Sequence, residues 1–572
     1  MKPIISLGTQ SFEFLRKNNC FFVDKTGLIE EWWENRDAVT LITRPRRFGK
    51  TLNMNMLECF FSSHYENRGD LFEGLSIWEK EEYRSLQGTY PVISLSFASV
   101  KGTTYHSARE GIIRAVRAAY RSHADLLKEG RLSPQEREYF LSLDRYVLDL
   151  NPQKSISDEL VSGAVNELSF YLFRHYGKKA LILLDEYDTP LQEAWVNGYW
   201  EEMVCFVRSL FNATFKTNSF MERGLLTGIT RISKESIFSD LNNLTVITTT
   251  SEMYCTRFGF TQEEVFEALD VFGMSEEKEN VKAWYDGFTF GSRKGIYNPW
   301  SITGFLKDGI YRPYWANSSS NNLINDLICQ GSPQTKTSVE DLMAGRALTT
   351  QLDEEVVFDQ LARSSAAVWS LLLAGGYLKV EERIFDRDRN RFLYRLMLTN
   401  LEVQMMFEDM IRGWFSQEDV PYNAFLRDLL AGDVDYMNVY MNEVARLTFS
   451  NFDTGNRPSG KANPERFYHG FVLGLIVELA GKYRISSNRE SGFGRYDIMI
   501  EPLENEDPAF VLEFKVKNPE REAALEDTLA QALAQIEKKN YDAELEARGI
   551  ARERIRHYGF VFEGKRVLIG GA

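Results

Sequence analysis

The order of a strand, a tight basic loop and a helix near the N-terminus constrains the fold of this chain more than any other feature. Residues 37–43 have an apolar strand pattern, residues 44–51 have the sequence Arg-Pro-Arg-Arg-Phe-Gly-Lys-Thr, and residues 52–61 have a helical pattern. At such a junction, backbone amides and the helix N-terminus bind phosphate groups. We therefore expect a parallel α/β domain with a nucleotide site at this loop.

The basic loop supplies the first candidate site residues. Lys50 would reach the outer phosphates of a nucleotide, and the Thr51 hydroxyl would ligate Mg²⁺. The usual pattern has a glycine where this chain has Arg44, and a Gly-Lys-Thr match alone is weak because short motifs also occur by chance. The nucleotide-binding candidates in the loop are Arg46, Arg47, Phe48, Gly49, Lys50 and Thr51.

A second apolar strand strengthens this interpretation. Residues 179–188 run from an apolar stretch into acids, so Asp185 would hold the magnesium ion and Glu186 would polarise the attacking water. The alternative is a buried parallel strand with an acidic exit turn, but the upstream loop favours the nucleotide site. A further strand over residues 224–231 ends in Arg231, which would either sense the γ-phosphate or form a structural salt bridge.

A short strand near the C-terminus indicates a second chemistry. In the strand at residues 510–517, Glu513 and Lys515 share one face, because alternate side chains of a strand point the same way. Asp497 lies on the preceding strand, and a hairpin through residues 501–508 would bring it beside Glu513. Two acids and a lysine are the minimal set for metal-dependent phosphodiester cleavage. The alternative is a solvated strand face with an ordinary charge pair.

The neighbours of this strand favour the catalytic alternative. Glu465 opens an apolar segment over residues 467–477 that predicts a buried helix, and residues 487–495 form a polar, glycine-rich loop. His469 could lean toward the metal site or be a core histidine. An amphipathic stretch over residues 523–541 carries Gln531 and Gln535.

This order of elements resembles the PD-(D/E)XK nuclease superfamily, in the form found behind an AAA-ATPase-like domain in bacterial and archaeal proteins. Tyr496 stands where the family name has proline, a position that varies in the superfamily. Some members bind nucleic acid without cutting it. The resemblance implies a core motif and metal ligands at Asp497 and Glu513, a catalytic Lys515, an auxiliary helix acid and metal ligand at Glu465, and a helix position at Gln535.

The N-terminal half resembles the AAA-ATPase-like family at several separate places. These matches lie at residues 21–26, 44–51, 183–188, 284–288 and 297–301. In that family an arginine in the place of Arg44 is normal, so the missing glycine does not argue against nucleotide binding.

The length of 572 residues is too great for one core, so three to four domains are expected, and the sequence patterns assign three. They are a P-loop AAA-ATPase-like domain over residues 1–245, a helical and winged-helix-like connecting region over 246–440, and a restriction-endonuclease-like α/β domain over 441–572. Helices are predicted at 261–269, 364–380 and 402–415, a strand at 392–398, and a polar linker at 451–463.

Composition and charge indicate the compartment and the kinds of partner expected for this chain. A net charge of -15 argues against unspecific coating of DNA, although a local basic groove remains compatible with it. The five cysteines have no ligand spacing and are expected to be reduced thiols. The first ten residues lack an apolar targeting core, and no apolar run reaches membrane-spanning length. We expect a cytoplasmic protein without a membrane partner.

The sequence thus predicts an ATPase joined to a metal-dependent nuclease that acts on nucleic acid under nucleotide control. Its cofactors would be ATP and Mg²⁺, with Mn²⁺ as an alternative at the nuclease site. One alternative is an ATP-driven switch whose nuclease fold only binds nucleic acid. Another is a signalling ATPase whose C-terminal domain binds protein. The intact acids favour cleavage, and the sequence leaves a homo-oligomer open.

Overall fold

The protein is described by a computed structural model that covers most of the chain. The residues outside its description are 1, 129, 146–155, 233–236, 239–240, 319–321, 330–332, 344, 353–364, 388, 416–421, 449–471, 473–475, 477–478, 480–481, 488–489, 492–493, 496, 504–506, 518–521, 523, 564–565 and 572. The predicted linker at 451–463, Glu465 and His469 lie outside the described residues.

The chain forms two compact units. The first contains residues 1–320 and 349–403, and the second contains residues 321–348 and 404–572. The domain boundaries predicted at residues 245 and 440 stay a prediction.

A five-stranded parallel sheet is the centre of the first unit. Its order is β2-β3-β4-β1-β5, and every neighbouring pair is parallel. Every residue of β1 and β3 is buried, which explains their continuous apolar sequences. The bounds are Val39–Thr43 for β1, Val92–Ser96 for β2, Ala180–Asp185 for β3, Met221–Gly228 for β4 and Leu244–Ile247 for β5.

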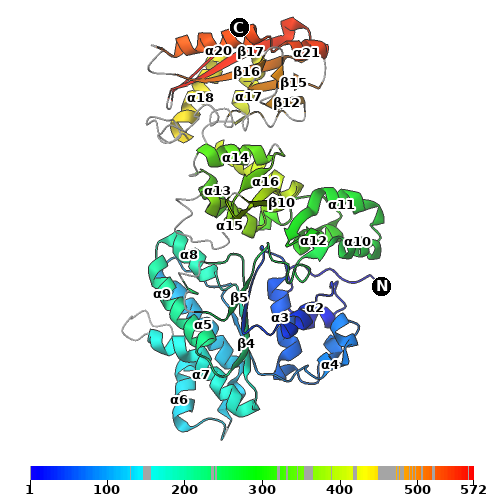
Figure 1. The fold of residues 1–572 in the computed structure, drawn as a ribbon, viewed down its shortest axis with the longest axis vertical. Helices are drawn as coiled ribbons and strands as arrows, with labels where there is room; N and C mark the ends of the chain where they lie inside the picture. Colours follow the sequence, from blue (N-terminus) through cyan, green and yellow to red (C-terminus); the bar gives the residue numbers. More distant parts are fainter. Residues whose placement is uncertain are drawn as a thin grey trace. The chain divides into compact units, whose positions relative to one another are not determined.

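Helices cover both faces of this sheet (Figure 1). On one side lie α2 (Gly27–Asn35), α3 (Lys50–Phe61) and α4 (Glu81–Arg84). The other side carries α5 (Tyr105–Ser122), α6 (Pro134–Arg145), α7 (Asp158–Tyr176) and α9 (Trp200–Phe211). The first unit also contains α1 (Phe12–Lys17), α8 (Thr189–Asn197) and the 3₁₀ turns η1 (Ser63–Tyr65) and η4 (Ala124–Leu127).

A smaller antiparallel sheet follows in the same unit. Its order is β6-β8-β7. Thr261 caps α10 as predicted, because its hydroxyl accepts from the Glu264 backbone while the Glu264 carboxylate accepts from the Thr261 backbone. The elements are β6 (Phe260–Thr261), α10 (Gln262–Val271), α11 (Lys278–Tyr285), β7 (Asp286–Phe290), β8 (Arg293–Tyr297) and α12 (Pro299–Asp308).

The strand predicted at 392–398 is present, whereas the helix predicted at 364–380 ends at Gly375 and residues 378–380 belong to a strand. Helix α15 (Ser365–Gly375) precedes an antiparallel hairpin of β10 (Leu378–Asp386) and β11 (Arg391–Leu398), in a sheet of order β10-β11-β9. Strand β9 spans Leu348–Thr350 and α16 spans Leu401–Phe415. A helix followed by a hairpin is the order expected of a winged-helix-like module.

The second unit contains a mixed five-stranded sheet of order β12-β15-β16-β17-β18. Only the β16–β17 pair is parallel among these described strands. The strands are β12 (Tyr483–Ser487), β15 (Ile498–Pro502), β16 (Ala509–Val516), β17 (Ile555–Glu563) and β18 (Arg566–Gly571). The helices are α13 (Asn322–Cys329), α14 (Pro333–Met343), α17 (Tyr422–Ala431), α18 (Val434–Thr448), α20 (Leu525–Lys539) and α21 (Ala543–Ala547).

The predicted α/β class, with a parallel N-terminal sheet, helices in the middle and a mixed C-terminal sheet, is confirmed. Two local expectations need correction. Asp497 precedes β15 instead of lying on it, and the expected loop at 487–495 contains the paired segments β13 (Glu490–Ser491) and β14 (Gly494–Arg495). Among the described helices, none is long and apolar enough to cross a membrane.

Candidate functional site

The Gly-Lys-Thr segment connects β1 to α3, as the sequence predicts. Gly49 adopts the left-handed conformation (φ 81°) immediately before α3 begins at Lys50. The buried Lys50 ammonium donates hydrogen bonds to the carbonyl oxygens of Arg44 and Pro45, both at 2.9 Å. Burial lowers the pKa of Lys50, while the carboxylates of Glu186 and Asp185 act in the opposite direction. The ammonium is therefore held inside the loop by groups that a phosphate could replace.

Thr51 and Asp185 connect the two predicted motifs directly. Thr51 Oγ1 donates to Asp185 Oδ2 across 2.7 Å. The other carboxylate oxygen, Asp185 Oδ1, accepts from Thr227 Oγ1 of β4 at 2.5 Å. Two elements, α3 and β4, thus fix the carboxylate at the end of β3, and together with the Thr51 hydroxyl it offers the oxygen ligands that Mg²⁺ prefers.

Two residues that the sequence analysis did not assign to the site hold the end of β3 against the end of β4. Asp188 Oδ2 accepts from the backbone amides of Ile229 and Thr230 at 3.0 and 2.9 Å. The Tyr187 hydroxyl donates to Thr230 O at 2.8 Å. The close approach requires glycine at 228, because a Cβ there would lie 2.7 Å from the Tyr187 ring and 2.8 Å from Asp188 Oδ1. The acidic run after Asp185 is the signal that could have indicated this role.

Glu186 leaves the strand in a left-handed conformation with a φ of 52°. Such backbone is uncommon for a residue other than glycine and costs energy. Its side chain lines the same cavity as Lys50 and Thr51. The carboxylate is therefore available to a ligand in that cavity.

Arg44 has a structural role in this loop. Its fully buried guanidinium donates to the carbonyl oxygens of Thr43 and Thr248 at 2.8 Å and of Tyr254 at 3.3 Å. The guanidinium carbon also lies 4.6 Å from the centre of the Phe290 ring. Burial lowers the pKa of Arg44 to about 10, so the group stays cationic at neutral pH. The residue that replaces the usual glycine therefore ties the loop to residues 248–254.

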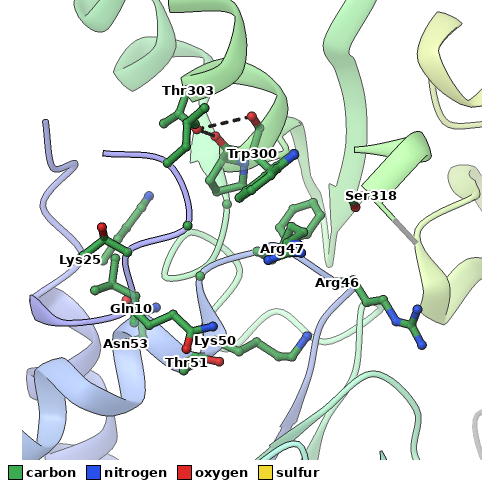
Figure 2. A pocket seen from close by; sticks show the side chains of 18 of the residues that line it. Gln10, Lys25, Arg46, Arg47, Lys50, Thr51, Asn53, Trp300, Thr303 and Ser318 are labelled. Atoms are coloured by element: carbon green, nitrogen blue, oxygen red, sulfur yellow. Dashed lines mark hydrogen bonds between the residues drawn. The ribbon is translucent and has the colours of Figure 1, made fainter. Parts of the chain in front are cut away.

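The next two arginines differ from Arg44 because both are exposed. The Arg47 guanidinium lies 4.4 Å from the centre of the Trp300 ring, and Figure 2 shows Arg46 pointing away from this pair. The Arg46 backbone carbonyl accepts from Trp315 Nε1 at 3.1 Å. The segments around α12 thus hold the loop's backbone, while the Arg46 side chain remains accessible.

A cavity of about 510 Å³ opens over the loop (Figure 2). It extends from Lys50, Thr51 and Glu186 to two N-terminal segments, residues 6–10 and 21–23. The predicted loop candidates Arg46, Arg47, Phe48 and Gly49 also line it. The sequence analysis did not assign residues 6–10 to the site, because a segment without charge or a glycine pattern gives no signal of its own. The strand predicted over residues 224–231 ends at Gly228, so Arg231 lies three residues beyond it, and Arg231 is not among the described residues that line this cavity.

The second predicted site is assembled in the second unit by the β15–β16 hairpin. Ile498 pairs with Leu512, which places Asp497 beside Glu513. Asp497 Oδ2 accepts from the Phe514 backbone amide at 2.8 Å. Glu513 is almost completely buried, and its Oε1 accepts from Lys515 Nζ at 2.9 Å. Leu512 and Phe514 point instead into the hydrophobic core, as the alternation predicts.

Helix α20 adds Gln535 to this cluster. Gln535 Nε2 donates to Glu513 Oε1, and it lies 3.3 Å from the Tyr541 hydroxyl. Burial raises the pKa of Tyr541, and the charges of Glu513 and Asp497 add to this shift. Gln531, one turn earlier on the same helix, is exposed. The cluster therefore combines two carboxylates, an ammonium and an amide, an oxygen-rich set that suits a hard divalent cation.

Comparison with known families agrees with both motifs. Residues 6–238 match the model of the predicted AAA-ATPase family, and residues 463–571 match that of the PD-(D/E)XK nuclease superfamily. The chain therefore carries an AAA-ATPase-like domain and a C-terminal domain of the PD-(D/E)XK nuclease superfamily, as the sequence predicted. It is also similar to an uncharacterized protein in the vnfD 5′ region of Azotobacter chroococcum mcd 1. That protein is 24% identical over 558 residues, which is 95% of this chain and 94% of the relative.

Proposed function

We propose that this protein binds and hydrolyses ATP in its first unit and that its C-terminal domain cleaves nucleic-acid phosphodiesters with a divalent cation, under the control of the bound nucleotide. The observation that carries the proposal is that both sites of one chain combine a lysine with carboxylates. Lys50 lies near Asp185 and Glu186, and Lys515 contacts Glu513.

At the nucleotide site, the phosphates replace the two carbonyl oxygens as partners of the Lys50 ammonium. Thr51 and Asp185 fit Mg²⁺ because both offer oxygen atoms, already 2.7 Å apart in one hydrogen bond. Bound there, Mg²⁺ would neutralise charge on the phosphates. Glu186 orients and polarises the attacking water, and the part of the cavity near residues 6–10 receives the base and ribose. Arg231, three residues after the end of β4, is the residue to which we assign sensing of the phosphate.

At the nuclease site, Asp497 and Glu513 hold Mg²⁺ or Mn²⁺, and the carboxylate oxygens in the cluster support this choice. A bound cation would activate water for attack on phosphorus. Lys515 stabilises the negative charge that develops on the phosphate. Gln535 keeps the Glu513 carboxylate in place, and Glu465, outside the described residues, is the additional acid that the superfamily resemblance implies.

The free thiols support a reducing location, which we take to be the cytoplasm. Cys20, Cys59, Cys205 and Cys255 are all unpaired with another cysteine. Burial raises the pKa of Cys59 to about 12, which keeps this thiol protonated and unreactive.

A cleavage assay tests this function. Labelled single- and double-stranded DNA and RNA are incubated with the protein in Mg²⁺ or Mn²⁺, and E513Q serves as the matched variant. Cleavage by the wild type that is lost in E513Q supports the proposal. Binding without cleavage in either cation favours a switch that only binds nucleic acid. Neither binding nor cleavage favours a signalling ATPase with a protein partner.

A further inference from the structure

Three residues from separate segments lie close together at the end of the parallel sheet where β2 begins. The nucleotide cavity is at the opposite end of the strands. His64 belongs to η1, His123 directly follows α5, and Asp125 belongs to η4. One ligand atom from each residue lies within 4.8 Å of the other two. They gather near Val92, the first residue of β2, whereas Lys50 and Asp185 lie at the carboxyl ends of strands.

His123 is prepared to accept a ligand on one defined nitrogen. Its ring is buried, and Nε2 lies 3.0 Å from the carbonyl oxygen of Val92. A carbonyl oxygen can only accept, so Nε2 carries the hydrogen and Nδ1 presents its lone pair. Nδ1 is buried without a hydrogen-bond partner among the described residues. A ring nitrogen held to a backbone carbonyl while the other is left open is the usual arrangement of a metal-ligating histidine.

Asp125 shows the same division between its two oxygens. Its Oδ2 accepts from Arg131 Nη1 at 2.6 Å, which fixes the carboxylate. Its Oδ1 is buried and has no hydrogen-bond partner among the described residues. Burial of a carboxylate oxygen without a hydrogen-bond partner costs free energy, and a cation bound to this oxygen would remove that cost.

His64 supplies the third and adjustable ligand. Its side chain is exposed, and its ring centre lies 5.0 Å from that of His123. Around a tetrahedral Zn²⁺ with bonds of about 2.1 Å, neighbouring ligand atoms are about 3.4 Å apart. The ligand atoms must therefore approach by up to about 1.4 Å, which rotation of the exposed His64 side chain can provide. Burial lowers the pKa of His123 to about 4, so this ring is neutral at pH 7, the form that binds metal.

We propose that His64, His123 Nδ1 and Asp125 Oδ1 form a binding site for a first-row transition metal of the Zn²⁺ class. Two imidazoles and one carboxylate are ligands that such ions accept, and water would complete the coordination. The ion would connect the turn after the phosphate-loop helix α3 to the end of α5 beside β2. This site is separate from the proposed nucleotide and nuclease sites, and its role is to stabilise the first unit.

The test measures metal binding in the full chain after treatment with a chelator. Zn²⁺ is titrated against a chromophoric competitor, and Co²⁺ absorption reports the ligand geometry. The variants are H64Q and D125N. The control is H106Q, a histidine near the opposite end of the same helix α5.

We expect the wild type and H106Q to bind one equivalent of Zn²⁺ at this site. The affinity of H64Q and of D125N for this equivalent should be at least about a hundredfold lower. Zn²⁺ should also raise the melting temperature of the wild type more than that of H64Q. Zn²⁺ bound at the proposed nucleotide and nuclease sites does not affect the result, because only the difference in Zn²⁺ binding between the wild type and each variant is used. The proposed site would be overturned by any of three results. These are equal stoichiometry and affinity in all four proteins, loss of Zn²⁺ binding in only one of the two ligand variants, or no Zn²⁺ binding by the wild type.

Discussion

Thr51 Oγ1 donates a hydrogen bond to Asp185 Oδ2 across 2.7 Å and so joins the first turn of α3 to the last residue of β3. These residues are separated by 134 positions in the chain. The contact places the hydroxyl and carboxylate expected to hold magnesium in one geometry before any ligand is bound. Lys50, the residue before Thr51, lies in the same cavity as Glu186.

The first prediction separates nucleotide binding from hydrolysis. K50A should weaken ATP binding by about 10- to 100-fold, because a charge-assisted contact to the phosphates is lost. E186Q should bind ATP nearly as well as the wild type but hydrolyse it about 10²- to 10⁴-fold more slowly. Titration of a fluorescent ATP analogue and phosphate release measure the two effects. K80A, an exposed lysine outside the cavity, is the control, and unchanged ATP affinity in folded K50A would contradict the assignment.

The second prediction distinguishes two arginines of the same loop. R44A should lower the free energy of unfolding by about 2–4 kcal/mol, because two buried carbonyl oxygens and one partly buried carbonyl oxygen lose a donor. R46A should leave stability nearly unchanged, since this side chain is exposed. Thermal and urea unfolding provide the measurement. Equal stability of R44A and R46A would show that the Arg44 contacts contribute little.

The third prediction concerns pH. Glu402 is buried, accepts from Ser301 Oγ at 2.8 Å and from the Trp315 amide at 2.5 Å, and burial raises its pKa from 4.5 to about 7. Because the folded protein holds this proton more tightly than the unfolded chain, the stabilising contribution is complete below about pH 4.5. It is lost as the pH rises through about 7, in total on the order of 3 kcal/mol.

The variant E402Q should remove this part of the pH dependence, because the amide does not titrate. Melting temperatures of the wild type and E402Q between pH 5 and about 8 measure the difference. E381Q, which changes an exposed acid of the same unit, is the control. Parallel curves for the wild type and E402Q would mean that Glu402 does not titrate in this range.

The fourth prediction uses two glutamines on one helix. Q535A should slow cleavage at least about tenfold, because Gln535 holds the Glu513 carboxylate, whereas Q531A should behave like the wild type because Gln531 is exposed. K515A should abolish cleavage. ATP hydrolysis should be unchanged in all three variants. Equal cleavage rates for Q535A and Q531A would argue against a positioning role for Gln535.

Much of the fold and of the two sites could be predicted because local pattern determines it. Alternation along β16 put Glu513 and Lys515 on one face, and the Thr261–Glu264 pair marked the start of α10. Asp497 was assigned to a strand that begins one residue later, a shift that a sequence pattern does not resolve.

Other features depend on residues far apart in the chain. Arg44 stands where the loop pattern usually has glycine, yet its partners Thr248 and Tyr254 lie on a segment some 200 residues away. His64 and His123 likewise meet only because α3 and α5 both end near β2. No local spacing in the sequence indicates these contacts, because they arise from the order of the strands in the sheet.

The proposed control of the nuclease by nucleotide state is tested by cleavage rates in ATP, in ADP and without nucleotide. The wild type, R231A and E513Q, which should not cleave, are compared on one labelled substrate in Mg²⁺. We expect different cleavage rates in the three states for the wild type and a smaller difference in R231A. Nucleic acid should also change the affinity for ATP by the same factor by which ATP changes the affinity for nucleic acid. Identical wild-type rates and affinities in all three states would contradict it.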